Sequence, residues 1–257
     1  MKFLIQQDAM DIENQLLINE INAQKYIHEY KEISLKSMQN QTDLEKGRIP
    51  VGTIDFVTEY LKRTENFEKE NPIEVPEYLR TRDFLKRDYH IVTWDKIPRQ
   101  GRYFIKDAST LKHFSYCGHL EYFIQEDMFE QPKNDFDTSL RLSKDALYVV
   151  SEALQVLSEY RVYVIGHEIV AISHYDGSPT IFPDTQILEN AVKLIKENEK
   201  WLRSYTIDVM VTKRGTSIIE VHNFASVGLY TTLFGSDLIW GYRDGIDYLL
   251  NDNKKLR

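Results

Sequence analysis

The chain has almost no cysteine, and this scarcity excludes two kinds of site. Cys117 is the only cysteine among 257 residues. The chain therefore forms no intramolecular disulfide and no zinc site built on cysteine ligands. Cys117 has no catalytic partner that is visible in the sequence, and a lone cysteine is more often a small core residue than a nucleophile.

Long apolar runs are also missing. No run approaches the roughly 20 apolar residues that a membrane-spanning helix needs. Residues 1–10 hold a short apolar run that is followed by Asp8, and they lack the long apolar region of a signal peptide. We therefore expect a cytoplasmic protein with no membrane partner.

The chain also lacks an excess of positive charge. The chain has 40 acidic and 32 basic residues, and its formal net charge is −8 at pH 7. This balance argues against a protein that binds duplex DNA through a basic surface, although a few local cations suffice for a small anionic ligand. Hydrophobic residues make up 42% and charged residues 28%, which is ordinary for a globular protein of one large or two small domains. No feature of the sequence indicates an oligomeric state.

What is present is a predicted β-hairpin over residues 207–224. Two β-rich runs flank Lys213-Arg214-Gly215, and glycine suits the left-handed position that closes a three-residue loop. Such a loop pairs Thr212 with Thr216, and this register decides which side chains of the two strands face each other.

The predicted register places Asp208 directly across from Glu220. Opposed side chains lie about 5 Å apart on one face of a sheet, so like charges there repel each other. His222 shares this face because side chains alternate along a strand. The opposite face is apolar and is expected to point toward a core; it carries Ile207, Val209, Val211, Ile219 and Val221.

Two explanations for the opposed acids stay open at this point. A divalent cation between Asp208 and Glu220 would offset their repulsion, and Mg²⁺ typically takes one or two protein carboxylates together with substrate phosphates. Alternatively, one of the acids pairs with a lysine or arginine elsewhere in the chain.

The rest of the chain alternates between predicted strands and helices, which favours an α/β N-terminal lobe. Strands are predicted over residues 2–6, 30–35, 102–106, 147–152, 159–165 and 168–173, the last two joined by a compact turn at Gly166-His167. Helices are predicted up to residue 28 and over residues 55–63, 76–87, 184–201 and 236–250, with Asp184 as a helix N-cap.

Two cations lie inside predicted strands. Lys106 shares a strand face with Phe104, and a lone lysine is usually a solvated surface group. Arg161 lies within an apolar strand, where an arginine normally needs an anionic partner.

The order of these features resembles the ATP-grasp fold, and more narrowly the small single-chain ATP-grasp proteins of phages and bacterial mobile elements. Each motif alone is weak, but their order and spacing together are fairly specific. The motifs that carry the resemblance are residues 49–57, 104–107 with 112–114, 150–152, 159–164 and 219–230.

The resemblance implies a role for each matching residue that contacts the nucleotide. Lys106 corresponds to a lysine on the nucleotide phosphates, and Lys112 to a second phosphate or lid contact. Arg161 corresponds to an arginine that faces the transferred phosphate, so Lys106 and Arg161 are the candidate catalytic residues. The remaining implied contacts are Val150, Ser151 and Glu152 along the adenine, mostly through backbone groups, and Glu159 near the ribose or the substrate.

The resemblance also implies that Asp208 and Glu220 hold Mg²⁺, with one further ligand. In the family the third ligand is an Asn two residues after the Glu, but here that position is His222 and Asn223 comes one residue later. Because imidazole is a poor partner for Mg²⁺, we expect Asn223 to be the ligand through a β-bulge. His222 stays nearby as a proton acceptor.

A second departure concerns the region that covers the phosphates. Asp107 follows Lys106 where many relatives have proline, and the region lacks a run of glycines. Lys112 and the hydroxyls of Ser109 and Thr110 are the groups that could cover the phosphates instead.

The implied fold is an α/β (α+β) ATP-grasp fold, in which an α/β N-terminal lobe precedes mixed or antiparallel sheets that sandwich the nucleotide. We expect the N-terminal lobe over residues 1–95 and the ATP-grasp region over residues 96–257. Within the latter, residues 96–150 form a small lid subdomain and residues 151–257 form the metal-binding subdomain.

The implied activity is that of an ATP- and Mg²⁺-dependent carboxylate–amine or carboxylate–thiol ligase, which forms an amide or peptide bond through an acylphosphate. Its partners are small-molecule or peptide carboxylates and amines. Two alternatives remain: a non-catalytic ATP-binding module of the same fold, and an α/β domain whose motif matches are coincidental.

Overall fold

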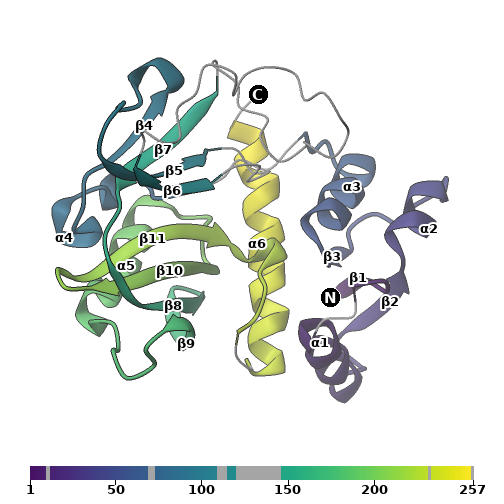
Figure 1. Cartoon of the computed structure of the whole chain (residues 1–257). Coiled ribbons are helices and arrows are strands. Elements are labelled where there is room, and N and C mark those ends of the chain that lie inside the picture. The colour runs from purple at the N-terminus through teal and green to yellow at the C-terminus, as the bar shows by residue number, and fades with distance from the viewer. Residues whose placement is uncertain (10–11, 69–72, 109–114, 120–145, 231–232, 256–257) are drawn as a thin grey trace.

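The computed structural model describes residues 1–9, 12–68, 73–108, 115–119, 146–230 and 233–255. A long C-terminal helix stands at the centre, between an N-terminal lobe on one side and two antiparallel sheets on the other (Figure 1). Within the described part of the chain, no helix has both the length and the apolar character needed to cross a membrane.

The N-terminal lobe is a three-stranded parallel sheet with helices, as the alternating pattern predicts. Its strand order is β2-β1-β3, and Thr53 caps the amphipathic third helix by accepting a hydrogen bond from the Phe56 amide. The elements are β1 (Lys2–Gln6), α1 (Ile12–Ala23), β2 (Glu29–Ile33), α2 (Leu35–Asn40), β3 (Ile49–Val51) and α3 (Ile54–Thr64).

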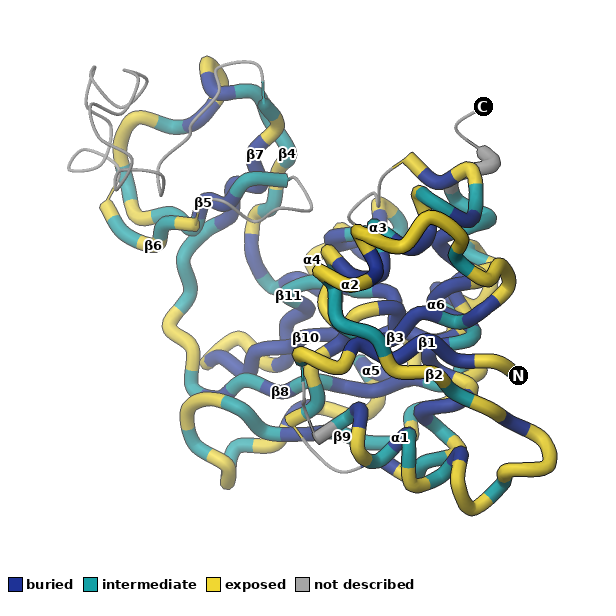
Figure 2. The backbone as a smooth tube through the Cα atoms, turned by 90° about the vertical axis from the view of Figure 1, so that its right-hand side faces the viewer, coloured by how far each residue is buried: buried dark blue, intermediate teal, exposed yellow. Residues whose placement is uncertain are grey.

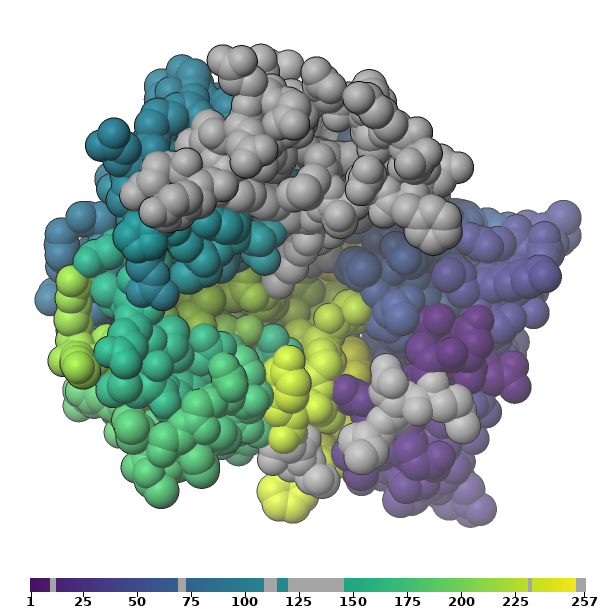
Figure 3. Space-filling model, in the orientation of Figure 1, coloured from purple at the N-terminus to yellow at the C-terminus, as the bar shows by residue number. Residues whose placement is uncertain are grey.

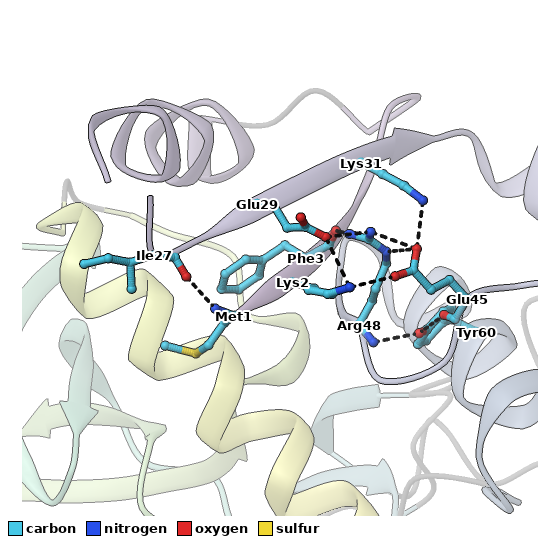
Figure 4. Close-up of polar contacts among 9 residues, drawn as sticks. All are labelled: Met1, Lys2, Phe3, Ile27, Glu29, Lys31, Glu45, Arg48 and Tyr60. Carbon is cyan, nitrogen blue, oxygen red and sulfur yellow. Dashed lines mark hydrogen bonds and ion pairs between the residues drawn. The ribbon is translucent and has the colours of Figure 1, made fainter. Parts of the chain in front are cut away.

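A charged network lies at the edge of this lobe where the three parallel strands begin (Figure 4). The guanidinium of Arg48 donates hydrogen bonds to the carboxylates of Glu29 and Glu45 at 2.8–2.9 Å. It also donates to the backbone oxygen of Phe3 at 3.0 Å. Lys31 completes the network by pairing with Glu45 at 2.8 Å. The network therefore ties the first strand to the segment that leads into the third.

The second layer is a four-stranded antiparallel sheet, here called the middle sheet, with the order β4-β7-β5-β6. A small core lies against it, formed by Trp94, Ile97, Ile105, Tyr148 and Val150. β4 belongs to this sheet although it precedes residue 95, and the expected domain limits stay a prediction. The strands are β4 (Tyr89–Thr93), β5 (Arg102–Asp107), β6 (Ser115–His119) and β7 (Leu147–Glu152), and a 3-10 turn, η2 (Trp94–Lys96), follows β4.

The prediction of one helix over residues 76–87 is wrong. This segment forms a 3-10 turn, η1 (Glu77–Leu79), and a single helical turn, α4 (Arg82–Leu85). Lys86 ends α4 in the left-handed region at φ 53°. Burial of Leu79, Phe84 and Leu85 against the main core decides the path here and overrides the local helical preference.

The third layer, here called the C-terminal sheet, is antiparallel with the order β11-β10-β8-β9. Gly166 and His167 both take positive φ in the predicted compact turn, and Asp184 caps the following helix through the Gln186 amide. The elements are β8 (Val156–Ile165), β9 (Glu168–Gly177), α5 (Thr185–Asn198), β10 (Tyr205–Thr212) and β11 (Gly215–Asn223).

The central helix α6 (Gly235–Lys255) packs directly on η5 (Phe224–Ser226), the short turn that ends β11. A Cβ on Gly241 would lie 2.6 Å from the Phe224 ring, and one on Gly245 would lie 2.5 Å from the Ala225 nitrogen. Glycine at these two positions lets the helix approach the turn closely. The contact belongs to a buried cluster that includes residues of the N-terminal lobe, the C-terminal sheet and α6. Figure 2 shows the buried stretches of the backbone in dark blue.

Candidate active site

The β10–β11 hairpin places Asp208 opposite Glu220, as predicted, but by a different route. The loop has two residues, Lys213 and Arg214, so that Thr212 pairs with Gly215 and not with Thr216. The Thr212 hydroxyl accepts a hydrogen bond from the Arg214 amide at 3.0 Å and donates to the Gly215 carbonyl at 3.1 Å. These bonds close a tighter turn than the glycine position alone indicates.

A β-bulge then restores the predicted pairing. The register shifts between Asp208 and Val209, which leaves Ile219 as the extra residue on β11. Because one inserted residue reverses the alternation, Ile218 is fully buried in the core and Ile219 lines the cavity between the sheets. The expectation that Ile219 faces the core is therefore wrong.

Lys106 reaches from the middle sheet to the C-terminal sheet. Its ammonium lies 2.5 Å from an oxygen of Glu220 and 2.6 Å from an oxygen of Glu74. Burial acts to lower the pKa of Lys106, but attraction by the carboxylates of Glu220 and Glu74 outweighs it and raises the pKa. Lys106 is a charged link between three segments and not a solvated surface group.

Glu74 is the residue of this cluster that sequence reasoning missed. It lies between the helices predicted over residues 55–63 and 76–87, and neither its spacing nor its neighbours mark it. Its backbone carbonyl accepts a hydrogen bond from the Val221 amide at 2.7 Å, which adds an isolated bridge to the free edge of β11. Only this long-range pairing brings its carboxylate beside Lys106.

Arg161 has the anionic partner that its place in an apolar strand requires. Its guanidinium donates two hydrogen bonds of 2.8 Å to the two oxygens of Asp208 and one of 3.0 Å to the Gly228 carbonyl. Its central carbon also lies 4.8 Å from the centre of the Tyr230 ring. Burial acts to lower the pKa of Arg161, but the bonds to Asp208 outweigh it and raise the pKa.

Both opposed acids are thus paired with cations of the chain, as the second explanation from sequence allows. Glu220 also accepts a contact of 2.6 Å from Nε2 of His222. Asp208, Glu220 and His222 each offer a ligand atom, and these three atoms lie within 4.8 Å of one another. They are the group in the described chain that could hold a metal ion.

The side chain of Asn223 does not point toward the opposed acids, contrary to the expectation. The bulge is at Ile219, and the register from Glu220 to Asn223 is regular, so Asn223 points away from the face of His222. Its side-chain oxygen accepts a hydrogen bond from the Ala225 amide at 2.8 Å and caps η5. The expected bulge beside Asn223 is therefore wrong.

A cavity of about 270 Å³ separates the middle and C-terminal sheets. Figure 3 shows the hollow between the teal atoms of the middle sheet and the green atoms below them. The cavity is lined by apolar residues of both sheets, among them Phe104, Val149, Met210 and Ile219, by Leu154 of the connection between β7 and β8, and by Lys106, Ser151, Glu152 and Glu159. The structure thus brings four of the predicted site residues to one cavity.

Three of the predicted contacts, Glu152 of the cavity lining among them, differ in what the structure shows of them. The Val150 side chain is 2% exposed and belongs to the small core of the middle sheet, so only its backbone remains for a ligand. Glu152 accepts two hydrogen bonds of 2.7 Å from Arg214, and these bonds lower its pKa. Lys112, with Ser109 and Thr110, lies outside the described residues.

Glu159 lies on the cavity side of the C-terminal sheet. Burial raises the pKa of its carboxyl group, although a hydrogen bond with Tyr175 acts in the opposite direction. The ring of Tyr175 stacks on that of Tyr230, with centres 5.0 Å apart. Glu159 is therefore connected through two aromatic rings to the side chain of Arg161.

A second cavity, of about 290 Å³, lies where the N-terminal lobe meets the segment after β11. Its lining includes Glu13, Gly52 and Thr53 from the lobe, and Ser226 and Gly228 from the C-terminal side. The carbonyl of Gly228 is the one that accepts a hydrogen bond from Arg161. This cavity therefore adjoins the charged cluster through Gly228.

Comparison with known proteins gives one family match. A model of the ATP-grasp domain, R2K clade family 2, matches residues 84–234. A search of the curated proteins finds no match.

Solved structures of ATP-grasp ligases resemble this chain over nearly their whole length. The ligase PsnB, complexed with a minimal precursor, has 13% identity and a TM-score of 0.57, covering 95% of this chain and 98% of that chain. The D-alanine–D-alanine ligase of Bacillus anthracis has 13% identity and a TM-score of 0.51, covering 99% and 97%. The macrocyclase MdnC of Microcystis aeruginosa MRC, bound to precursor peptide MdnA, has 13% identity and a TM-score of 0.50, covering 98% and 100%. At such identities the likeness shows the fold, and the predicted mixed α/β ATP-grasp fold is confirmed.

Proposed function

This chain belongs to the ATP-grasp proteins of R2K clade family 2, and we propose that it is an ATP- and Mg²⁺-dependent ligase that joins a carboxylate to an amine or a thiol through an acylphosphate. The observation that carries the proposal is the buried charged cluster beside the cavity between the two sheets. In it Lys106 and Arg161 lie next to the opposed acids Asp208 and Glu220.

The cavity fits a nucleotide in its chemistry. Apolar side chains from two facing sheets suit the purine, and Ser151 and Glu152 lie on the strand that the resemblance places along the adenine. Tyr89 also lines the cavity, and its buried hydroxyl has no hydrogen-bond partner among the described residues. Lys106 supplies the positive charge that phosphates need.

The charged cluster fits a divalent cation. Three largely buried carboxylates, on Glu74, Asp208 and Glu220, face the cations Lys106 and Arg161, so these acids outnumber the lysine and arginine of the cluster by one. Carboxylate oxygens are the ligands that Mg²⁺ prefers. We propose that Asp208 and Glu220 would hold the ion, which when bound would neutralise charge on the β- and γ-phosphates.

The third ligand stays open between two residues. His222 is within reach of both acids but offers nitrogen, which suits Mg²⁺ poorly. Asn223 offers oxygen but would have to release the Ala225 amide that it caps.

Phosphoryl transfer requires the cations to exchange partners. Arg161 donates to both oxygens of Asp208, so it must leave at least one of them to contact a phosphate. A phosphate group is a strong acceptor for a guanidinium, which compensates for the lost carboxylate bonds. We propose that Arg161 and Lys106 then stabilise the charge on the transferred group.

In the proposed reaction a carboxylate oxygen attacks the γ-phosphorus of ATP, which releases ADP and leaves an acylphosphate. The nitrogen of an amine then attacks the acyl carbon, phosphate leaves, and the nitrogen loses a proton. We place these substrates in the second cavity, because it adjoins Arg161 through Gly228. PsnB and MdnC are described with precursor peptides, which supports peptide carboxylates and amines as substrates beside small molecules. The cytoplasmic location and the phage-type origin stay predictions.

A non-catalytic ATP-binding module is the second candidate. Two observations favour it: His222 stands where the family has Asn, and both acids are satisfied by cations of the chain. In such a protein ATP would bind without turnover.

Thermal unfolding with ATP or ADP, with and without Mg²⁺, tests both candidates. A ligand that binds only the folded state stabilises it by about 2.7 kcal/mol at a concentration of one hundred times Kd. We expect a shift with ATP that requires Mg²⁺, followed by ADP release when suitable carboxylates and amines are added. Binding without ADP release supports the module, and no shift with any nucleotide contradicts both.

A further inference from the structure

Lys106 is shared by two carboxylates that come from distant parts of the chain. Glu220 belongs to the C-terminal sheet, whereas Glu74 lies in the segment that leads out of the N-terminal lobe. Their side chains are 12% and 5% exposed, so both charges are largely removed from water. A buried carboxylate is strongly disfavoured unless a cation or hydrogen-bond donors accompany it.

The position of Glu74 is specifically built. Its backbone is in the left-handed region at φ 53°, a conformation that residues other than glycine rarely adopt. The bridge to Val221 holds it against β11, one residue from Glu220, and the neighbouring Val75 is fully buried in the main core. Strain of this kind persists when the surroundings require it, and it occurs often at functional sites.

We propose that Glu74 is a positioning residue that keeps Lys106 in place at the nucleotide cavity, so that Glu220 is free to bind the cation. The inference rests on the proposed function. Lys106 is the only ion-pair partner of Glu74 within the described ranges, so the pair can persist when Glu220 turns away. Without Glu74, the ammonium of Lys106 and the metal ion would compete for the same carboxylate of Glu220.

The proposal predicts a change in metal dependence and not merely in stability. In Glu74→Gln, Lys106 keeps Glu220 as its single carboxylate, and the variant is expected to fold. We expect the Mg²⁺ concentration at half-maximal thermal stabilisation, measured with saturating ADP, to rise roughly tenfold, as for a typical coupling between two sites. Glu77→Gln, three residues away at an exposed position, is the matched control and should leave the midpoint unchanged.

A second comparison tests whether Glu74 acts through Lys106. In a Lys106→Met background, Glu74→Gln should cause no further rise in the Mg²⁺ midpoint. A rise of the same size there would mean that Glu74 acts on the cation directly, which would overturn the proposal.

If Lys106→Met does not fold, Glu74→Asp replaces this comparison. Aspartate keeps the negative charge beside Lys106 and should hold the midpoint within about threefold of the wild type. A midpoint as high as that of Glu74→Gln would overturn the proposal.

Failure of the inference differs from failure of the proposed function. If ADP and Mg²⁺ do not stabilise the wild type, the proposed function fails. If they stabilise the wild type and Glu74→Gln with the same midpoint, or if Glu74→Gln lowers only the stability of the free protein, the role of Glu74 alone is wrong.

Discussion

Two charged networks in this molecule differ in how far their acids are buried. In the N-terminal lobe only the cation is inside: the Arg48 side chain is 3% exposed, while Glu29 and Glu45 are 55% and 37% exposed. In the candidate active site acids and cations are both inside, with Asp208 and Glu220 at 6% and 12% exposure and Arg161 and Lys106 at 14% and 10%.

The difference separates a structural network from one that can take a ligand. The acids around Arg48 reach water and are also paired with Lys2 and Lys31, so the network needs nothing further. The buried acids of the site outnumber their cations, and buried excess charge is costly. A cation from solution can therefore improve the second network and not the first.

The largest expected effect comes from removing the acids of the site. Asp208→Asn with Glu220→Gln should abolish Mg²⁺-dependent ADP release, by on the order of a thousandfold or more, because charge on the phosphates is no longer offset. Circular dichroism should show an intact fold, since Lys106 keeps Glu74 and Arg161 keeps the Gly228 carbonyl. Exposed acids provide the control in Glu168→Gln with Glu197→Gln. Full activity of Asp208→Asn with Glu220→Gln would contradict the proposed metal site.

Removing the cation that lines the cavity should have the next largest effect. Lys106→Ala should weaken ATP binding roughly a hundredfold, because a charge-assisted contact to phosphate is lost in a partly desolvated site. Isothermal titration measures the affinity, and Lys193→Ala, on the exposed face of α5, should match the wild type. An unchanged affinity for Lys106→Ala would mean that the phosphates lie elsewhere.

Breaking the Arg48 network should damage the fold and spare the chemistry. Arg48→Met removes three charged contacts and the hydrogen bond to the Phe3 carbonyl, and it should lower the free energy of unfolding by about 2 kcal/mol. Urea unfolding measures this loss, while ATP affinity should not change. Arg82→Met breaks an exposed pair and should cost about 0.5 kcal/mol or less. A loss of ATP affinity in Arg48→Met would contradict the separation of the two networks.

Lowering the pH should change the stability contributions of Glu45, in the Arg48 network, and of Glu159, at the candidate site, in opposite directions. Hydrogen bonds from Lys31, Arg48 and Lys2 lower the pKa of Glu45 from 4.5 to about 2. Its stabilising contribution is therefore complete above pH 4.5 and is lost as the pH falls toward 2. Burial raises the pKa of Glu159, so protonation of that residue favours the folded state as the pH falls.

Urea midpoints between pH 5 and pH 2.5 measure this small difference. The wild type should lose more stability over this range than Glu45→Gln. Glu159→Gln should instead be more stable than the wild type at neutral pH, because the buried charge is absent. Equal pH profiles for Glu45→Gln and the wild type would contradict the role assigned to Glu45.

The hairpin shows how far local patterns reach. Period-two alternation and the glycine near the loop predicted that Asp208 faces Glu220, which is correct. The predicted loop was one residue too long and the bulge at Ile219 was not foreseen, and these two errors cancel at the acids. They do not cancel at Ile219, because every residue between loop and bulge is shifted by one position.

Local sequence was enough to predict the alternation of strands and helices, the hairpin with its opposed acids, the helix capped by Asp184, and the need of Arg161 for an anion. Each depends on neighbours along the chain or across one turn, where spacing fixes geometry. The tertiary structure alone decided that Lys106 meets Glu220, 114 residues away, and that Glu74 joins them. Such contacts follow from how separate layers pack over a shared core, because the free energy of burial depends on the whole fold and leaves no local periodicity in the sequence.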